Sequence, residues 1–147
     1  MPALTVRVRN LSSLQAKVKR LDWGIQASVV VALRGIAGPL EEDVKNSILT
    51  GLKTGRLVRR YNPFRIHRAS APGQAPANDL GMLVASIEAD VDPHQFNLTL
   101  SAGAPYAREL EYGTRNMLPR PFLRPALTRW RERIINAIHD AIKGGLS

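Results

Sequence analysis

The chain has 147 residues, 44% of them hydrophobic, and a formal net charge of +9. This length and composition suit a single globular domain over residues 1–147 and exclude a disordered tail. Because the chain has no cysteine, disulfides, thiolate nucleophiles and cysteine zinc sites are excluded, which fits a protein made in a reducing cytoplasm.

The N-terminal third predicts a short strand followed by a long helix. Residues 5–9 alternate apolar and basic side chains, as a half-buried strand does. Over residues 11–48 the apolar positions recur every three or four residues, the period of one long amphipathic helix or two nearly collinear ones. We expect a kink at Gly38-Pro39, because proline removes a backbone donor and crowds the preceding turn, and a second weak point at Gly24.

The N-terminus lacks the features of a secretory signal, since the opening segment MPALTVRVRN has no basic start followed by an apolar core. No apolar run approaches the roughly 20 residues that a bilayer-spanning helix needs. We therefore expect no secretory signal and no membrane partner.

Positive charge concentrates in residues 53–79, which predict a long basic loop or arm. Six Lys and Arg residues precede the first acid of this stretch, Asp79. A hairpin from about Arg56 to His67 is compatible with the pattern. One interpretation is a solvated, partly mobile excursion; the other is an arm that contacts DNA phosphates or inserts into a neighbouring subunit. The candidates for contact with DNA or a partner are Arg56, Arg59, Arg60, Arg65 and Arg68.

The C-terminal half predicts a hairpin, a helical turn and a helix. Residues 87–91 and 96–102 alternate in polarity on either side of a turn at 92–94. Residues 106–112 predict a short helical turn. A last helix has one apolar face, formed by Leu127, Trp130, Ile134, Ala137, Ile138 and Ala141. Together these elements predict an α+β fold, in which a long N-terminal helix, kinked or split, and an amphipathic C-terminal helix pack on a small antiparallel sheet.

The most constrained stretch is residues 103–127, which we call the elbow. Gly113 suits a positive φ and therefore a sharp turn. Three prolines then fix φ, and the last of them, Pro125, suits the first turn of a helix. We expect a stiff corner displaying aromatic and arginine side chains, either as a docking element or as a structural corner. The residues expected to shape it are Tyr106, Glu111, Tyr112, Gly113, Thr114, Arg120, Pro121 and Phe122.

Two stretches, in order, carry a resemblance to a known family. The first is SAPGQAPANDLG at residues 70–81, which leads into Leu83 and Ser86-Ile87. The second comprises APYA at 104–107, LEYGT at 110–114, Met117, and RPFLRPA at 120–126. Together they cover about half the chain. They resemble bacteriophage neck and tail-completion proteins, a family that includes the gene product ten-like proteins of long-tailed phages and is related to the minor tail protein Z of phage lambda.

The resemblance implies a small α+β subunit that assembles into a ring, expected to hold six copies, in the neck between a phage head and its tail. The implied partners are further copies of the chain, a head-side connector or stopper protein and the tail-tube protein, in a virion made in the cytoplasm of a bacterial host. The elbow would then lie at contacts between subunits. The alternative is that Tyr112 and Phe122 fill a gap inside the subunit, between hairpin and helix.

Catalytic, cofactor and metal interpretations find little support. The three histidines are scattered, and Asp90 and Asp92 share a strand face without further ligands nearby. No phosphate loop, dinucleotide glycine pattern, nucleophile elbow or zinc helix is present. We therefore expect no enzyme, no cofactor and no metal.

The alternative function is a nonspecific basic nucleic-acid-binding protein. Basic zones lie at residues 53–68 and 115–133, and arginine, at 16 Arg against 5 Lys, suits phosphate as well as carboxylate. No DNA-reading module is recognised, so a sequence-specific reader is not expected. Nonspecific contact with packaged DNA inside a ring stays open.

Overall fold

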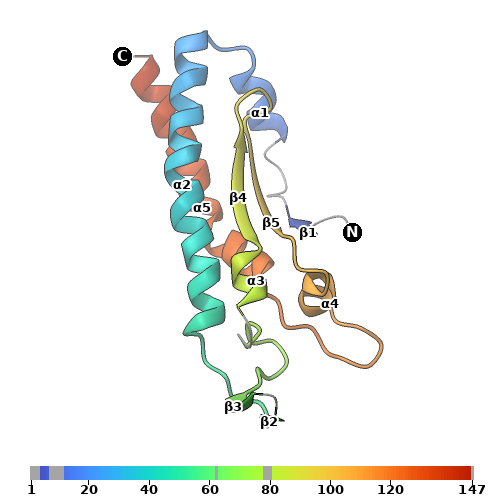
Figure 1. The fold of residues 1–147 in the computed structure, drawn as a ribbon. Helices are drawn as coiled ribbons and strands as arrows, with labels where there is room; N and C mark the ends of the chain where they lie inside the picture. Colours follow the sequence, from blue (N-terminus) through green and yellow to red (C-terminus); the bar gives the residue numbers. More distant parts are fainter. Residues whose placement is uncertain (1–3, 7–11, 62, 78–80, 147) are drawn as a thin grey trace.

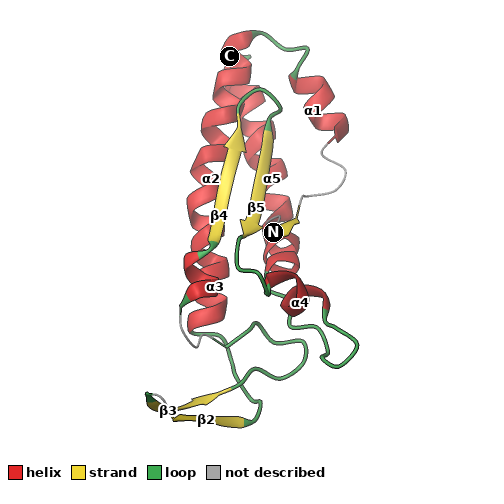
Figure 2. Ribbon diagram, turned by 45° about the vertical axis from the view of Figure 1, so that its right-hand side comes forward, coloured by secondary structure: helices red, strands yellow, loops and turns green. Residues whose placement is uncertain are grey.

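The computed structural model describes residues 4–6, 12–61, 63–77 and 81–146. It confirms the predicted α+β class: two long helices run side by side against a three-stranded antiparallel sheet, and a separate two-stranded hairpin lies at one end (Figures 1 and 2). The elements in chain order are β1 (Leu4–Val6), α1 (Ser12–Val18), α2 (Trp23–Leu49), β2 (Leu57–Tyr61), β3 (Phe64–Arg68), α3 (Met82–Ala85), β4 (Ile87–Asp92), β5 (Asn97–Ala102), α4 (Ala107–Tyr112) and α5 (Leu123–Gly145).

The long N-terminal helix is split, but not at Pro39. The break lies at residues 19–22, and α2 continues through Pro39. Two features make the proline tolerable. Gly38 has no Cβ to clash with the ring that follows it, and Gly35, whose carbonyl loses its donor, lies exposed where water can hydrate it. The side chain of Gln26 spans the actual break, because its Nε2 donates to the carbonyl of Leu21 at 3.0 Å.

The sheet has the order β1-β5-β4, and the predicted hairpin is confirmed. In its register Ile87 lies opposite Ala102 and Asp92 opposite Asn97. One face alternates into the core, while the other carries polar side chains outward. The predicted turn forms because Oδ1 of Asp92 accepts the backbone N–H groups of His94 and Gln95, at 2.8 and 3.1 Å.

The open edge of β4 faces α2. Oε2 of Glu41 in α2 accepts the backbone N–H of Ala89 at 3.0 Å, and Oε1 pairs with Nζ of Lys45 at 2.6 Å. Both contacts favour the carboxylate and hold the pKa of Glu41 below its ordinary value of 4.5. A side chain of the neighbouring helix thus satisfies a strand amide that would otherwise be open to pairing with another chain.

Helix α5 makes its most extensive contact with α2, and the two helices bury their facing sides together with the inner face of the sheet. Trp130 is only half-buried, and its Nε1 donates to Oδ2 of Asp43 at 3.1 Å. Arg129 pairs with the same oxygen at 2.7 Å. The predicted apolar face of the last helix is therefore a core face, with its polar edge joined to α2.

By length and composition alone α2 would qualify as a membrane span, with a mean hydropathy of 1.2 in its most apolar window. The expectation that no apolar stretch is long enough is corrected on that point. In the structure Leu33, Leu40 and Val44 of this helix are buried in the core. They belong to the side of α2 that packs on the rest of the molecule, and 28% of the most apolar window is buried in all.

Candidate functional site

The elbow turns at Gly113, which follows α4. Its φ of +78° confirms the predicted positive φ, and its N–H closes the helix by donating to the carbonyl of Glu109 at 2.8 Å. A Cβ placed on this residue would lie 2.7 Å from the carbonyl oxygen of Met117 and 2.9 Å from Cδ of Pro119. Glycine is therefore required twice, by the backbone angle and by the close approach of the returning chain.

A tight turn follows Gly113. Thr114 and Met117 exchange backbone hydrogen bonds of 2.8 and 3.3 Å, and the N–H of Arg120 then donates to the carbonyl of Leu110 at 2.7 Å. Pro125 lies in the first turn of α5, as predicted. These contacts fasten the extended stretch after the turn to α4, so the elbow is a closed corner.

A buried carboxylate holds the corner at the start of α5. Glu111 is fully buried, with 0% of its surface exposed. Its Oε2 accepts the N–H groups of Phe122 and Leu123 at 2.8 and 3.0 Å, and its Oε1 accepts both the N–H and Nε of Arg124 at 3.0 Å. The first N–H groups of a helix lack partners within the helix and attract negative charge. Glu111 supplies both acceptor and charge from another element, in place of a local capping side chain.

Arg124 links the buried carboxylate to the surface. Its Nη2 also donates to the carbonyl of Glu111 at 3.1 Å, and its guanidinium lies over the ring of Tyr112, 4.7 Å from the centroid. Arg124 was not among the residues predicted to shape the elbow. The available signal was the order of residue types: Glu111 precedes a helix start marked by Pro125, and Arg124 lies in the first turn of that helix.

The predicted elbow residues divide into three groups. Glu111 and Phe122, at 0% and 2% exposure, lie inside the subunit, so the intramolecular interpretation holds for Phe122. Tyr112, at 48%, does not fill an internal gap; it lies on the surface with Tyr106 and Thr114. The other three form the connection itself, and are Gly113, Arg120 and Pro121.

Residues 69–77, in the second half of the basic loop, are tied to the elbow and to α2. Nε of Arg120 donates to the carbonyl of Ser70 at 3.2 Å, and the N–H of Gly73 donates to Pro119 at 2.9 Å. Nζ of Lys53 donates both to the carbonyl of Ala75 at 2.9 Å and to that of Ser47 in α2 at 3.1 Å, and burial lowers the pKa of this lysine. The interpretation of a solvated excursion is therefore wrong for these residues.

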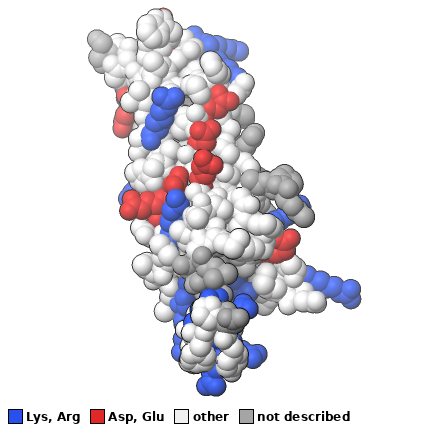
Figure 3. Space-filling model, in the orientation of Figure 1, with Lys and Arg blue, Asp and Glu red and all other residues white. Residues whose placement is uncertain are grey.

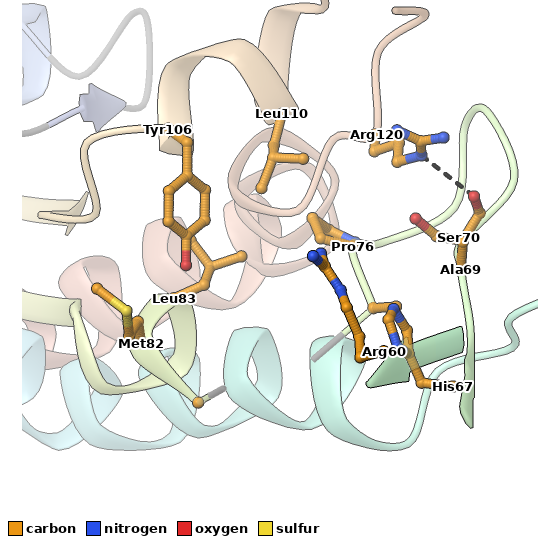
Figure 4. A pocket seen from close by; sticks show the side chains of 12 residues that line it. Arg60, His67, Ala69, Ser70, Pro76, Met82, Leu83, Tyr106, Leu110 and Arg120 are labelled. Carbon is orange, nitrogen blue, oxygen red and sulfur yellow. Dashed lines mark hydrogen bonds between the residues drawn. The ribbon is translucent and has the colours of Figure 1, made fainter. Parts of the chain in front are cut away.

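A hollow of about 440 Å³ lies between the elbow, α3 and the hairpin. Tyr106, Leu110 and Arg120 of the elbow face Arg60 and His67 of the hairpin across it (Figure 4). Its described walls hold arginines, a histidine and a phenol, but no carboxylate and no thiol. Such a lining suits packing or an anionic group.

The predicted hairpin at Arg56 to His67 is confirmed as β2 and β3, paired from Leu57 opposite Arg68 to Tyr61 opposite Phe64. Arg60, Arg65 and His67 lie on one side of the hairpin, and Arg60 and His67 of this side line the hollow. Arg56 lies before β2 begins. The opposite side, which we call the outward hairpin face, consists of Leu57, Arg59, Tyr61, Phe64, Ile66 and Arg68.

The outward hairpin face is apolar as well as basic. Its four apolar members are each more than half exposed, at 54% for Leu57, 76% for Tyr61, 65% for Phe64 and 52% for Ile66. The rings of Tyr61 and Phe64 lie 5.8 Å apart. The arginines of this face were predicted as contact residues, but its apolar surface was not. The available signal was the alternation of apolar and basic residues in β3, which reads FRIHR.

Among the residues that the structure describes, no three His, Asp or Glu side chains lie close enough to hold a metal ion. Comparisons of the chain with protein-family models, with curated proteins and with solved structures each found no match.

Proposed function

We propose that the protein is a structural subunit of a phage-like virion neck, where copies form a ring that joins or completes the tail at the head-tail interface. The elbow carries the proposal. The residues that resemble neck and tail-completion proteins fall largely within one corner, and the side chain of Glu111 ties that corner to the start of α5. Residues 70–77 of the first resembling stretch are hydrogen-bonded to the same corner.

The proposed mechanism is binding without chemistry. The ion pair between buried Glu111 and half-exposed Arg124 fixes where α5 begins, so Tyr106, Tyr112 and Thr114 are presented on a closed corner. Rigid surfaces lose little conformational entropy on association. Identical copies that contact head to tail close into a ring, here taken as six, whose two axial faces differ. One face would meet a head-side connector or stopper protein and the other the tail-tube protein.

The second candidate is a nonspecific nucleic-acid-binding protein. It is favoured by the six Lys and Arg residues of residues 53–68, a stretch without any acid. Two observations weigh against it as the main function. The apolar members of the outward hairpin face separate the charges, and Lys53 is occupied by the carbonyls of Ser47 and Ala75. DNA contact inside a ring is compatible with the first proposal.

The direct test is to locate the chain in a particle. The gene would be expressed with the genes that flank it, with a small C-terminal tag on this chain, and released particles would be imaged by electron microscopy after gold labelling of the tag. We expect gold at the junction of head and tail. Tailed particles labelled elsewhere, or not labelled at all while the tag is accessible in the free chain, would reject the proposal.

A further inference from the structure

We propose that the outward hairpin face docks on the outer sheet face of a second copy of this chain. The outer sheet face is the side of the three-stranded sheet that points away from the helices, and consists of Glu88, Asp90 and Asp92 of β4 with Asn97, Thr99 and Ser101 of β5. The inference rests on the proposed ring and names the two surfaces that close it.

The hairpin lacks a partner for its apolar side in the single subunit. A two-stranded hairpin is at best marginally stable alone in water and normally packs an apolar face on another element. Here the face with Leu57, Tyr61, Phe64 and Ile66 is exposed, while the opposite side borders the hollow. Figure 2 shows β2 and β3 at the far end of the molecule from α1, away from the three-stranded sheet. Four exposed apolar side chains gathered on one face of a hairpin are typical of an interaction site.

The chemistry of the face favours protein over nucleic acid. Leucine and isoleucine side chains form no favourable contact with a phosphate backbone. On this face Leu57 and Ile66 lie beside Arg59 and the aromatic pair of Tyr61 and Phe64. Aromatic side chains and arginine together are the residues most enriched at protein interfaces.

Charge complementarity identifies the occupant as a second copy. The outward hairpin face carries two cations, Arg59 and Arg68, and no acid. The strands of the three-stranded sheet carry three acids, all of which point outward, and no Lys or Arg. In Figure 3 Lys and Arg gather at the lower end, over the hairpin, and Asp and Glu lie higher, where α2 and β4 run. Opposite potentials of this kind steer and orient association.

The contact cannot form within one molecule, because the hairpin lies at one end, beyond α3, and the outer sheet face lies along the middle (Figures 1 and 2). It therefore uses two different surfaces, and each copy offers both. Such a heterologous contact repeats from copy to copy and closes into a ring when the rotation permits.

A charge exchange tests the contact. Arg59→Glu reverses an exposed charge on the outward hairpin face, and Asp90→Arg reverses an exposed charge on the outer sheet face. We expect each single variant to raise the concentration at half-assembly about tenfold, measured by mass photometry and sedimentation velocity. The double variant R59E/D90R, which restores opposite charges, should recover most of the wild-type assembly. Arg131→Glu, an exposed charge on α5, is the matched control and should change nothing.

Cysteine pairing tests the same contact without relying on charge. Because the chain has no cysteine, Ile66→Cys and Thr99→Cys each introduce a single thiol, on the outward hairpin face and the outer sheet face respectively. Mixed under mild oxidation, the two variants should give a disulfide-linked pair in high yield. Val31→Cys, exposed on α2, replaces Thr99→Cys in the control mixture and should give little.

The outcomes separate this inference from the proposed function. Rings that assemble unchanged in R59E and D90R, with no link between positions 66 and 99, overturn the docking contact and leave the neck proposal standing. A wild-type chain that stays monomeric at every concentration also overturns the contact, and the neck proposal then depends on the gold-labelling experiment alone. If Arg59→Glu abolishes binding to a random-sequence DNA duplex while assembly is unchanged, the hairpin serves nucleic acid and the inference is wrong.

Discussion

At the scale of single residues, the side chain of Glu111 joins α4 to the start of α5. It is one of only two buried polar side chains among the described residues, the other being Ser70. It compensates four donors: three backbone N–H groups and the Nε of Arg124. Removing one partner of a buried, hydrogen-bonded charge pair is costly, because the remaining groups stay desolvated and unsatisfied.

We therefore expect Glu111→Ala to lower the free energy of unfolding by about 2–4 kcal/mol. This loss is smaller than for a fully buried pair, because Arg124 is half exposed and water can hydrate it. Glu111→Gln keeps one acceptor but turns an amide N–H₂ group toward N–H donors, so about 1–3 kcal/mol should be lost. Chemical denaturation measures both. The control is Glu109→Gln, which changes an exposed glutamate of the same helix. Equal stability of Glu111→Ala and wild type would contradict the capping role.

Gly113 gives the second residue-scale prediction. Gly113→Ala places a Cβ against the Met117 carbonyl and imposes a backbone angle that other residues resist. The expected loss is about 2 kcal/mol or more in the free energy of unfolding. Gly113→Val should be worse and should block assembly into particles. A normal particle yield from Gly113→Val would remove the reason for assigning the elbow a part in assembly.

At the scale of elements, α2 shows how a helix tolerates an internal proline. Gly35→Ala should stabilise the protein by about 0.5–1 kcal/mol, because the new Cβ meets nothing within 4 Å and alanine favours the helix. Gly38→Ala should not stabilise the protein, although its Cβ would also meet nothing within 4 Å. A residue with a Cβ directly before Pro39 disfavours helical backbone angles. Thermal unfolding of the two variants measures the difference. Equal gains would contradict this account of the continuous helix.

The edge of β4 makes stability depend on acid. The pKa of Glu41 is lowered in the folded state, so its contribution to stability is present above the unfolded pKa and is lost as the pH falls through the folded value. The free energy of unfolding should therefore fall below about pH 5, and Glu41→Gln should flatten this limb. Glu42→Gln, at the exposed neighbouring position, is the control. Identical pH profiles for Glu41→Gln and wild type would show that the contacts to Lys45 and Ala89 contribute nothing.

Most elements could be predicted because their signals are local. The alternation in residues 87–91 and 96–102, the three- and four-residue period of α5, and the glycine and prolines of the elbow each specify a conformation within a few residues. The place of the split between α1 and α2 could not be predicted, because the tolerance of Pro39 depends on which helix face is exposed. Contacts between distant residues, such as Glu41 with Ala89, leave no sequence signal of their own.

The candidate site was predictable in outline for the same reason. The positive φ of Gly113 and the start of α5 follow from the local residue types. The donors that Glu111 accepts could not be predicted, because they come near α4 only when the chain folds back after Gly113. The anchoring of residues 69–77 by Arg120 and Lys53 was missed because a loop without period carries no information about its tertiary hydrogen bonds.

At the scale of the whole molecule, charge is unevenly distributed: the hairpin end is basic and the outer sheet face acidic. In the proposed ring this asymmetry would be used between copies, which would leave little free positive charge for DNA. We expect weak affinity of the isolated chain for a random-sequence duplex, with a shallow dependence on salt, measured by fluorescence anisotropy at several salt concentrations. Tight binding that weakens steeply with salt would favour the nucleic-acid-binding alternative.

The central claim is that this chain is a ring subunit whose rigid elbow and hairpin meet neighbouring copies. The most direct measurement is a cryo-electron microscopy map of the neck of a particle that contains it. The account predicts a closed ring in which the outward hairpin face lies on the acidic sheet face of the next copy and Tyr112 lies at a protein contact. Copies absent from the neck, or present with elbow and hairpin both bathed in solvent, would contradict it.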